Sequence, residues 1–171
     1  MDQIVIRKEL PKDLSQVRKL NEAAFETDDE ARLVDILRKI NINLISLVAE
    51  ENGVILGHIL FSPVTLSSNP NKLALTGLAP MAVLLDYQKK GIGSALIRKG
   101  LDFCRKAGYK AVVVLGHPKY YPKFGFVPSV QFNIKSEYDV PDNVFMIQEL
   151  EKGALKNCSG VISYHEAFGG L

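Results

Sequence analysis

The pair of glycines Gly91 and Gly93, in the middle of the chain, is the feature that most restricts the fold. A long apolar run, KLALTGLAPMAVLL (72–85), precedes the pair and predicts a β-strand, in which Gly77 and Pro80 indicate a bulge or a splayed edge. A helix-like pattern with apolar residues along one face follows the glycines directly. Strand, glycine turn and helix in direct succession predict a domain that mixes α and β structure.

The flanking segments support this mixed α/β (α+β) class. Asn52-Gly53 is a strong hairpin signal between two β-rich runs, and AVVVL (111–115) is apolar throughout, as expected of a strand covered on both faces. The patterns predict strands at 3–9, 43–51, 54–64, 72–85, 111–115, 144–150 and 159–168, helices at 14–25, 28–40 and 92–107, and a loop with a helical turn at 116–126. Because no Pro-, Gly- or Ser-rich linker divides the chain, we expect a single domain over residues 1–171.

The composition argues against several function classes. The 21 basic and 19 acidic residues leave a net charge of +2, which is small for a general nucleic-acid-binding surface. Cys104 and Cys158 have no CxxC or Cys/His spacing, so neither a disulfide scaffold nor a zinc site is expected. No run approaches the ~18 apolar residues of a membrane-spanning helix, and MDQIVIRKEL at the N-terminus has no apolar signal region. We therefore expect a cytoplasmic protein without a metal ion and without a nucleic-acid or membrane partner.

The stretch QKKGIGSALI (88–97) has the chemistry of an anion site. The first N–H groups of a helix have no backbone acceptor, and together with the helix dipole they attract phosphate. Gly91 and Gly93 carry no side chain that would hold a ligand away from the backbone, and either can adopt a positive φ. Lys89 and Lys90 add positive charge, so the stretch suits a pyrophosphate.

Three phosphate-binding motifs compete for this stretch. A Walker loop ends in Gly-Lys-Ser/Thr, whereas here Ser94 follows Gly93 without an intervening lysine. The dinucleotide fingerprint G-x-G-x-x-G fails because Leu96 stands at its last place. Two interpretations of Gly-x-Gly alone stay open, namely a plain turn before a surface helix and an acetyl-CoA loop.

Two motifs together resemble those of the GNAT superfamily of acyl-CoA-dependent N-acetyltransferases. LAPMAVLLDYQKKGIGSALI (78–97) is similar to that family's strand, its Gln/Arg-x-x-Gly-x-Gly/Ala turn and its helix, and YPKFGF (121–126) fits the later Tyr-x-x-x-Gly-Phe motif. Gly91 and Tyr121 are 30 residues apart, which fits the family's spacing of about thirty. The order of the predicted elements also fits, so the resemblance covers roughly residues 2–165. The segment around Tyr121 and the C-terminal tail resemble a bacterial subgroup of predicted acetyltransferases whose substrates are poorly defined.

The resemblance implies a GNAT fold and acetyl-CoA as the cosubstrate. In that fold a mixed, mostly antiparallel sheet is flanked by helices and splayed between its fourth and fifth strands. Met81, Ala82 and Val83 would pair with the pantetheine arm, and the backbone of Gln88, Lys89, Lys90, Gly91, Ile92, Gly93 and Ser94 would hold the pyrophosphate. Two departures bear on the loop conformation, because relatives often have proline at the position of Leu85 and glycine at that of Lys89.

The activity implied by the resemblance is transfer of an acetyl group to a primary amine of a small molecule or peptide by direct attack. Tyr121 matches the family's general acid, which would protonate or hydrogen-bond the leaving thiolate. A backbone N–H near Val83 would stabilise the carbonyl oxygen as negative charge develops. No general base is evident; Glu22, Glu26, His58 and His117 are candidates by region only, and each also fits an ordinary structural role.

Two other functions compete with this one. The lack of an evident base suits a catalytically weak CoA-binding sensor or interaction domain, whereas the intact Tyr121 argues against it. A modifier of aminoacyl-tRNA would be expected to carry a stronger basic face than a net charge of +2 indicates. Exposed strand edges near the C-terminal end are compatible with a homodimer.

Overall fold

The computed structural model describes residues 3–40 and 43–170, and the chain divides into two compact units. The first unit comprises Met1–Phe61, Ala79–Gly100 and Glu166–Leu171, and the second comprises Ser62–Leu78 and Leu101–His165. Strand β3 (Val54–Ser68), strand β4 (Leu75–Val83) and helix α3 (Ile92–Lys106) each contribute residues to both units. The single domain expected from the sequence stays a prediction.

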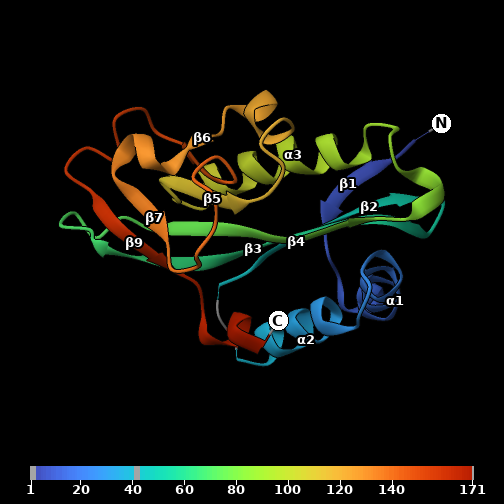
Figure 1. The fold of residues 1–171 in the computed structure, drawn as a ribbon. Coiled ribbons are helices and arrows are strands. Elements are labelled where there is room, and N and C mark those ends of the chain that lie inside the picture. The colour runs from blue at the N-terminus through green and yellow to red at the C-terminus, as the bar shows by residue number, and fades with distance from the viewer. Residues whose placement is uncertain (1–2, 41–42, 171) are drawn as a thin grey trace. The chain divides into compact units, whose positions relative to one another are not determined.

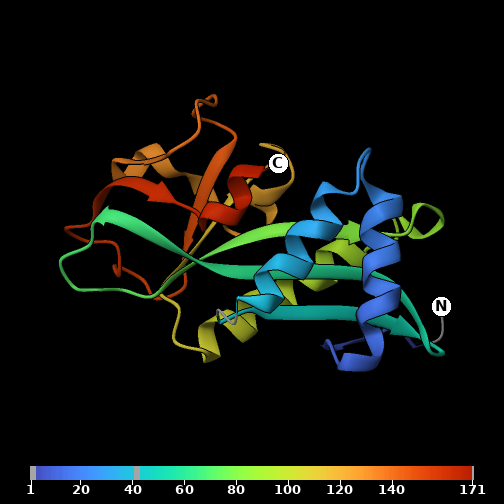
Figure 2. The same ribbon diagram turned by 90° about the horizontal axis from the view of Figure 1, so that it is seen from below.

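In the first unit, two helices cover one face of antiparallel strands. Strand β2 (Ile45–Glu51) pairs with β1 (Val5–Lys8) on one side and with β3 on the other. Helices α1 (Leu14–Ala24) and α2 (Asp29–Lys39) lie together on one side of these strands (Figures 1 and 2). The side chains of a strand alternate between its two faces, so neighbouring β3 residues face the helix pair and the start of α3 in turn.

The hairpin between β2 and β3 forms where the sequence predicts it. Asn52 and Gly53 both have positive φ, at 50° and 81°, which is the backbone conformation of a type I′ turn. Helix α2 begins with Asp29 and Glu30 and ends with Arg38 and Lys39, so its charges complement the helix dipole at both ends.

The second unit is built mainly from short strands around one buried strand. The bounds are β5 (Ala111–Leu115), β6 (Val127–Pro128), β7 (Ile134–Ser136), β8 (Phe145–Glu149) and β9 (Ser159–Ser163). Strand β5 lies between β4, which is parallel, and β8, which is antiparallel. Strand β9 pairs antiparallel with β3 and parallel with β7. Four of the five β5 side chains are buried, as the uninterrupted apolar run predicts.

The parallel pairing of β4 with β5 is short. It joins Leu75, Thr76 and Gly77 to Ala111, Val112 and Val113, and it ends after these three pairs, although β4 continues to Val83 and β5 to Leu115. The splay predicted between the fourth and fifth strands therefore begins at Gly77. A Cβ at Gly77 would lie 2.8 Å from Cε1 of Tyr164, so only glycine allows this ring to approach the strand.

The structure differs from the predicted elements in two places. The predicted strand at 159–168 ends at Ser163, and a 3-10 helix (Glu166–Gly170) follows it. Strands β6 and β7 and the 3-10 turn between them, Ser129–Phe132, have no predicted counterpart. Strands of two and three residues are too short to show a periodic pattern, and Pro128 in β6 removes a backbone donor, which weakens the strand signal further.

Candidate active site

In the first unit, the loop from the end of β4 to the start of α3 is tied back to the strand that precedes it. The Leu84 N–H donates to the carbonyl of Leu56 in β3 at 2.9 Å. The Gln88 side-chain amide donates to the Val83 carbonyl at 3.1 Å, and a 3-10 turn, Leu85–Tyr87, fills the interval. The predicted pantetheine strand and the predicted pyrophosphate loop are therefore held together.

The backbone of this loop alternates between ordinary and left-handed conformations. Lys89 has φ of 62° and Gly91 has φ of 89°, and α3 begins immediately afterwards at Ile92. All four residues from Gln88 to Gly91 are exposed. An alternation of this kind turns successive N–H groups towards one side, and such concave arrangements bind anions. Lys89 thus takes the left-handed conformation that glycine would take most easily at the same position.

The first turn of α3 is anchored by apolar contacts. Ile92 and Leu96 are buried, and a Cβ placed on Gly57 of β3 would lie 3.1 Å from Cγ2 of Ile92 and 3.0 Å from Cδ1 of Leu96. The helix therefore approaches the β3 backbone as closely as a glycine permits. Of the predicted cosubstrate-binding residues, Ile92 offers a ligand only its backbone, because its side chain is part of the core.

The other predicted binding residues lie in the same unit. Ala82 is buried and packs with Val17 and Val48, whereas Met81 and Val83 are half-buried. Gly93 and Ser94 are also half-buried, in the first turn of α3. The structure thus gathers the ten predicted residues into one strand end, one loop and one helix start.

In the second unit, Tyr121 lies in a cluster of aromatic rings. Its side chain is 8% exposed, and its ring makes edge contacts with those of Tyr120 at 5.2 Å and Phe126 at 5.7 Å between centroids. Burial raises the pKa of the Tyr121 phenol to about 12, with a smaller contribution from Tyr120. The phenol is therefore protonated at neutral pH.

Two glycines make room for the turn that carries Tyr121, and only one of them belongs to a sequence motif. A Cβ at Gly116 would lie 2.4 Å from Cε2 of Tyr121, so the ring lies directly against that backbone. Gly125, the motif glycine, has φ of 99° and would bring a Cβ to 2.9 Å from the Gln148 side-chain nitrogen. Sequence reasoning missed Gly116, although a glycine directly after a buried strand is a signal for a close approach.

His58 does not have the surroundings of a general base. It is fully buried in β3, with Nδ1 at 3.3 Å from the Asn21 amide nitrogen and Nε2 at 2.8 Å from the Ser46 hydroxyl oxygen. Burial, and to a smaller extent the charge of Arg38, lowers its pKa to about 3. His58 is therefore a neutral, hydrogen-bonded core residue of the first unit.

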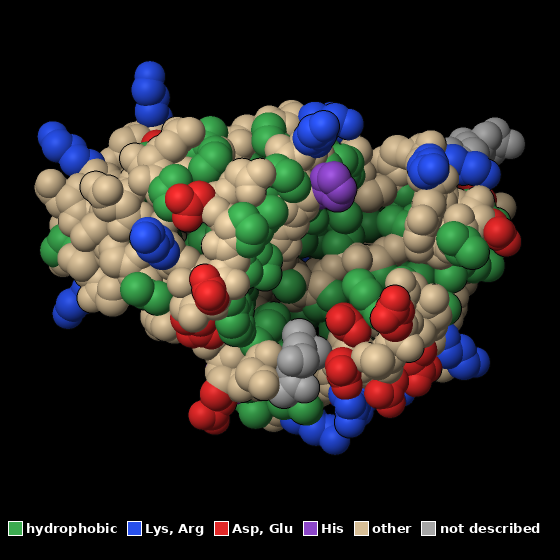
Figure 3. Space-filling view, viewed as in Figure 1, with side chains coloured by type: hydrophobic (Ala, Val, Ile, Leu, Met, Phe, Trp, Pro, Cys, Tyr) green, Lys and Arg blue, Asp and Glu red, His purple; other side chains and the backbone are tan. Residues whose placement is uncertain are grey.

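The remaining base candidates are surface residues. Glu22 lies on α1 and pairs with Arg18 at 3.6 Å, and Glu26 is exposed just beyond the end of that helix. Acidic side chains gather over α1 and α2 (Figure 3). His117 is exposed, and its carbonyl accepts hydrogen bonds from the N–H groups of Tyr120 and Tyr121, so its backbone shapes the turn. No base is assigned.

Residues 3–40 and 43–170 contain neither a candidate metal site nor a candidate membrane span. In those ranges no three His, Cys, Asp or Glu side chains are grouped so that they could hold a metal ion. No helix there is both long enough and apolar enough to cross a bilayer.

Comparison with known proteins gives consistent matches over most of the chain. Residues 14–126 match the sequence model of the acetyltransferase (GNAT) family. The uncharacterized N-acetyltransferase YhbS of Escherichia coli K12 is 34% identical over 166 residues, which cover 96% of this chain and 98% of that protein.

Two solved structures are similar to this chain in fold and sequence. The crystal structure of E. coli YhbS, a GNAT family N-acetyltransferase in complex with CoA, has a TM-score of 0.92 and 34% identity and covers 98% of this chain and 92% of that one. A GNAT family acetyltransferase from Brucella melitensis in complex with acetyl-CoA has a TM-score of 0.80 and 35% identity. This match covers 98% of this chain and 99% of that one.

Proposed function

The chain belongs to the GNAT family of acetyltransferases, and on that premise we propose that it transfers the acetyl group of acetyl-CoA to a primary amine of a small molecule or peptide. The loop at 88–94 carries the proposal. Its exposed backbone, with left-handed residues at Lys89 and Gly91 directly before a helix start, has the form of a pyrophosphate site. The relatives from E. coli and B. melitensis were solved with CoA and acetyl-CoA, which supports the same cosubstrate here.

In the proposed complex, backbone groups do most of the binding. The amides from Gln88 to Ser94 hold the pyrophosphate, and the strand end Met81–Val83 pairs with the pantetheine arm. Ile92 contributes only its N–H, because its side chain is buried. The ammonium groups of Lys89 and Lys90, both exposed, add charge that attracts the phosphates from solution.

In the proposed reaction, an uncharged amine nitrogen attacks the carbonyl carbon of the thioester. A C–N bond forms and the C–S bond breaks, so the electron pair of that bond leaves on the thiolate of CoA. The nitrogen gives its extra proton to water or to a base, and the thiolate takes up a proton to become the thiol. A backbone N–H near Val83 stabilises the oxygen of the tetrahedral intermediate.

Tyr121 is the proposed donor to the departing thiolate. A thiol has a pKa of about 8.5, whereas the buried phenol has one of about 12, so full proton transfer from Tyr121 would be uphill by roughly 3–4 pKa units. Donation of a hydrogen bond from the phenol to the developing thiolate avoids this cost, and solvent can supply the proton afterwards. We therefore propose Tyr121 as a hydrogen-bond donor that stays protonated throughout the cycle.

A thiol-release assay with acetyl-CoA and a panel of primary amines tests the function, and Tyr121→Phe tests the role of the phenol. We expect release with at least one amine, and an approximately 10²-fold lower kcat in Tyr121→Phe, which is the usual loss when one hydrogen-bond donor to a developing negative charge is removed. The affinity for CoA, measured by calorimetry, should stay close to that of the wild type, because the phenylalanine ring keeps the aromatic packing.

The outcomes of this assay are distinct. Unchanged turnover in Tyr121→Phe would remove the phenol from the mechanism while leaving the activity in place. If CoA binds but no amine supports thiol release, the chain is instead a CoA-binding sensor or interaction domain.

A further inference from the structure

Two buried side-chain oxygens in the first unit have no hydrogen-bond partner. Among the described residues of that unit, the shielded side-chain atoms without a partner are Oδ1 of Asn21 and Oε1 of Glu30. Leaving a polar atom unpaired and away from water costs free energy, so each such atom in a native structure calls for an explanation. Both atoms are hydrogen-bond acceptors, so the group that is missing is a donor.

Glu30 lies on the face of α2 that is turned towards the core. Leu33, Val34 and Leu37 follow it at spacings of three, four and seven residues, and each of them is at most 2% exposed. A carboxylate therefore occupies a position in this stripe where the helical pattern favours an apolar side chain. Departures of this kind from the apolar pattern are typical of functional sites.

The acidic residues next to Glu30 have cations from the fold. Asp28 and Asp29 both pair with Arg32, which lies on the exposed side of α2. A carboxylate in the first turn of a helix can also accept hydrogen bonds from the free N–H groups there, but Oε1 of Glu30 accepts none. Among the described residues, neither an ion pair nor helix capping accounts for this oxygen.

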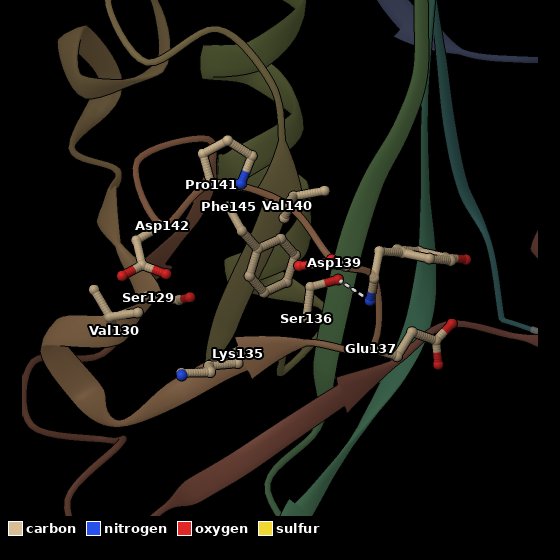
Figure 4. A pocket seen from close by; sticks show the side chains of 11 residues that line it. Ser129, Val130, Lys135, Ser136, Glu137, Asp139, Val140, Pro141, Asp142 and Phe145 are labelled. Carbon is tan, nitrogen blue, oxygen red and sulfur yellow. Dashed lines mark hydrogen bonds between the residues drawn. The ribbon is translucent and has the colours of Figure 1, made fainter.

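The carboxylates of the second unit are a different case. A pocket of about 350 Å³ lies under the segment that joins β7 to β8, and Asp139 and Asp142 are among the residues that line it (Figure 4). Both residues are exposed, so water can hydrate their oxygens and no ligand is needed. Oε1 of Glu30, by contrast, is shielded from solvent.

Asn21, on α1, carries the second unpaired oxygen. Its side chain is fully buried, and Nδ2 donates to the Val17 carbonyl at 3.1 Å and lies 3.3 Å from Nδ1 of His58. Because a carbonyl oxygen can only accept, the amide nitrogen must be the atom that faces Val17. This orientation leaves Oδ1 on the other side of the amide group, without a donor.

The two oxygens belong to the same end of the helix pair. Asn21 is one turn before the end of α1, and Glu30 is in the first turn of α2, which follows after a short connection. Phe25, in that connection, packs against the cluster that contains Ala82 of β4. This end of the helix pair therefore packs over Met81–Val83, the strand end that the proposed function assigns to the pantetheine arm.

We propose that Glu30 is the catalytic base of the acetyl transfer and that Oδ1 of Asn21 binds the attacking nitrogen. The inference rests on the proposed function, because it names the base of the same reaction. When the C–N bond forms, the nitrogen of a primary amine becomes positively charged and keeps two N–H bonds. One N–H gives its proton to Oε1 of Glu30 and leaves its electron pair on the nitrogen, while the other donates to Oδ1 of Asn21. The half-buried Glu30 then releases the proton to water, and the thiolate takes up its own proton separately.

Thiol release with acetyl-CoA and the amine panel measures the contribution of Glu30. Glu30→Gln keeps the size of the side chain and removes the base, so kcat should fall about 10²-fold, which is within the usual range for loss of a general base. The affinity for CoA and the urea midpoint of unfolding should not fall, because Oε1 has no partner to lose. Glu26→Gln is the matched control, since it changes an exposed acid just beyond α1, and it should leave kcat unchanged.

Chemical rescue separates a base from a structural residue. Glu30→Ala leaves space for a small carboxylate, so sodium formate should restore part of the lost turnover, whereas sodium chloride at the same ionic strength should not. Glu30→Gln should not respond to formate, because its amide fills the space. A loss of turnover that comes with a lower urea midpoint and without rescue would make Glu30 a structural residue and overturn the assignment.

Calorimetric titration of the CoA complex of the full chain with butylamine gives a readout that needs no turnover. We expect the wild type and Glu26→Gln to bind butylamine, and Glu30→Gln to bind it about tenfold more weakly. Wild-type binding and turnover in Glu30→Gln would overturn the assignment, leave the two oxygens to bound water and leave the acetyl transfer standing. Binding that depends on Glu30, without thiol release from any amine, would contradict the transfer and keep Glu30 and Asn21 as an amine site. If the wild type shows neither, both proposals fail.

Discussion

The loop that begins α3 and the turn that carries Tyr121 both depend on glycine, but for different physical reasons. A Cβ added at Gly91 would meet no atom within 4 Å, and the residue matters because its φ is 89°. Gly116 has no such φ and matters because the Tyr121 ring lies against it. One region needs glycine for its backbone conformation, and the other needs it for space.

The two regions also differ in what they offer a ligand. The loop at 88–94 is exposed over most of its length and presents backbone groups, whose positions follow from the start of a helix. The turn presents a single buried phenol, whose position depends on packing against Tyr120, Phe126 and Gly116. A substitution in the loop should therefore affect binding, and one in the turn should affect the chemical step.

Gly93→Val should have the largest effect of these substitutions, and it should lower the affinity for CoA. A branched side chain in the first turn of α3 would cover the N–H groups that we assign to the pyrophosphate. Loss of two charge-assisted hydrogen bonds at about 1.5 kcal/mol each corresponds to an affinity at least about 100-fold lower. Calorimetry with CoA measures the change, and Lys99→Val, at an exposed position of the same helix, is the control for the effect of valine on helix formation. Wild-type affinity in Gly93→Val would show that the anion site lies elsewhere.

Gly116→Ala should have a smaller effect, and it should lower kcat. The added methyl group would lie 2.4 Å from Cε2 of Tyr121, so the ring must shift and the phenol moves away from its position. We expect kcat to fall about tenfold, within the usual cost of a displaced catalytic group, while the affinity for CoA changes little.

A double-mutant cycle decides whether Gly116 acts through Tyr121. If it does, Gly116→Ala should add almost nothing in the Tyr121→Phe background, because the phenol is already absent. Equal losses in both backgrounds would mean that the glycine affects turnover independently of Tyr121.

The sequence predicted the elements of both regions better than their contacts. Helix α3 and strand β5 follow from apolar periodicity and from an uninterrupted apolar run, which are local signals. A glycine directly after a buried strand signals a close approach. Which ring approaches Gly116 depends on how the turn folds back on the strand end, and no local pattern encodes that. Strands β6 and β7 were missed for a related reason, since they are two and three residues long and the segment after β7 has no periodic pattern.

The conformation of Lys89 was also beyond prediction, although its position was noted. Residues other than glycine adopt a positive φ in only a few per cent of cases, so a lysine gives no signal for it. Relatives often have glycine at this position, so the sequence left open which backbone conformation the lysine adopts. The structure shows that Lys89 keeps a left-handed backbone, with φ of 62°.

Lys89→Gly should have the smallest effect and separates backbone from charge within the loop. A left-handed backbone at a residue other than glycine costs about 1–2 kcal/mol of folding free energy, and glycine avoids this cost. The more flexible unfolded state of glycine offsets about 0.5–1 kcal/mol of that gain in stability. We therefore expect the free energy of unfolding to rise by up to about 1 kcal/mol, measured by urea denaturation.

Lys90→Gly is the matched control, because it removes the same charge at a residue without a positive φ. It also removes the contact of the Lys90 ammonium with the Tyr87 ring at 5.3 Å. It should lower the stability where Lys89→Gly raises it. If both variants weaken CoA binding equally, the two ammonium groups contribute alike through charge; if Lys89→Gly binds CoA as the wild type does, the backbone conformation is what the loop requires at that position.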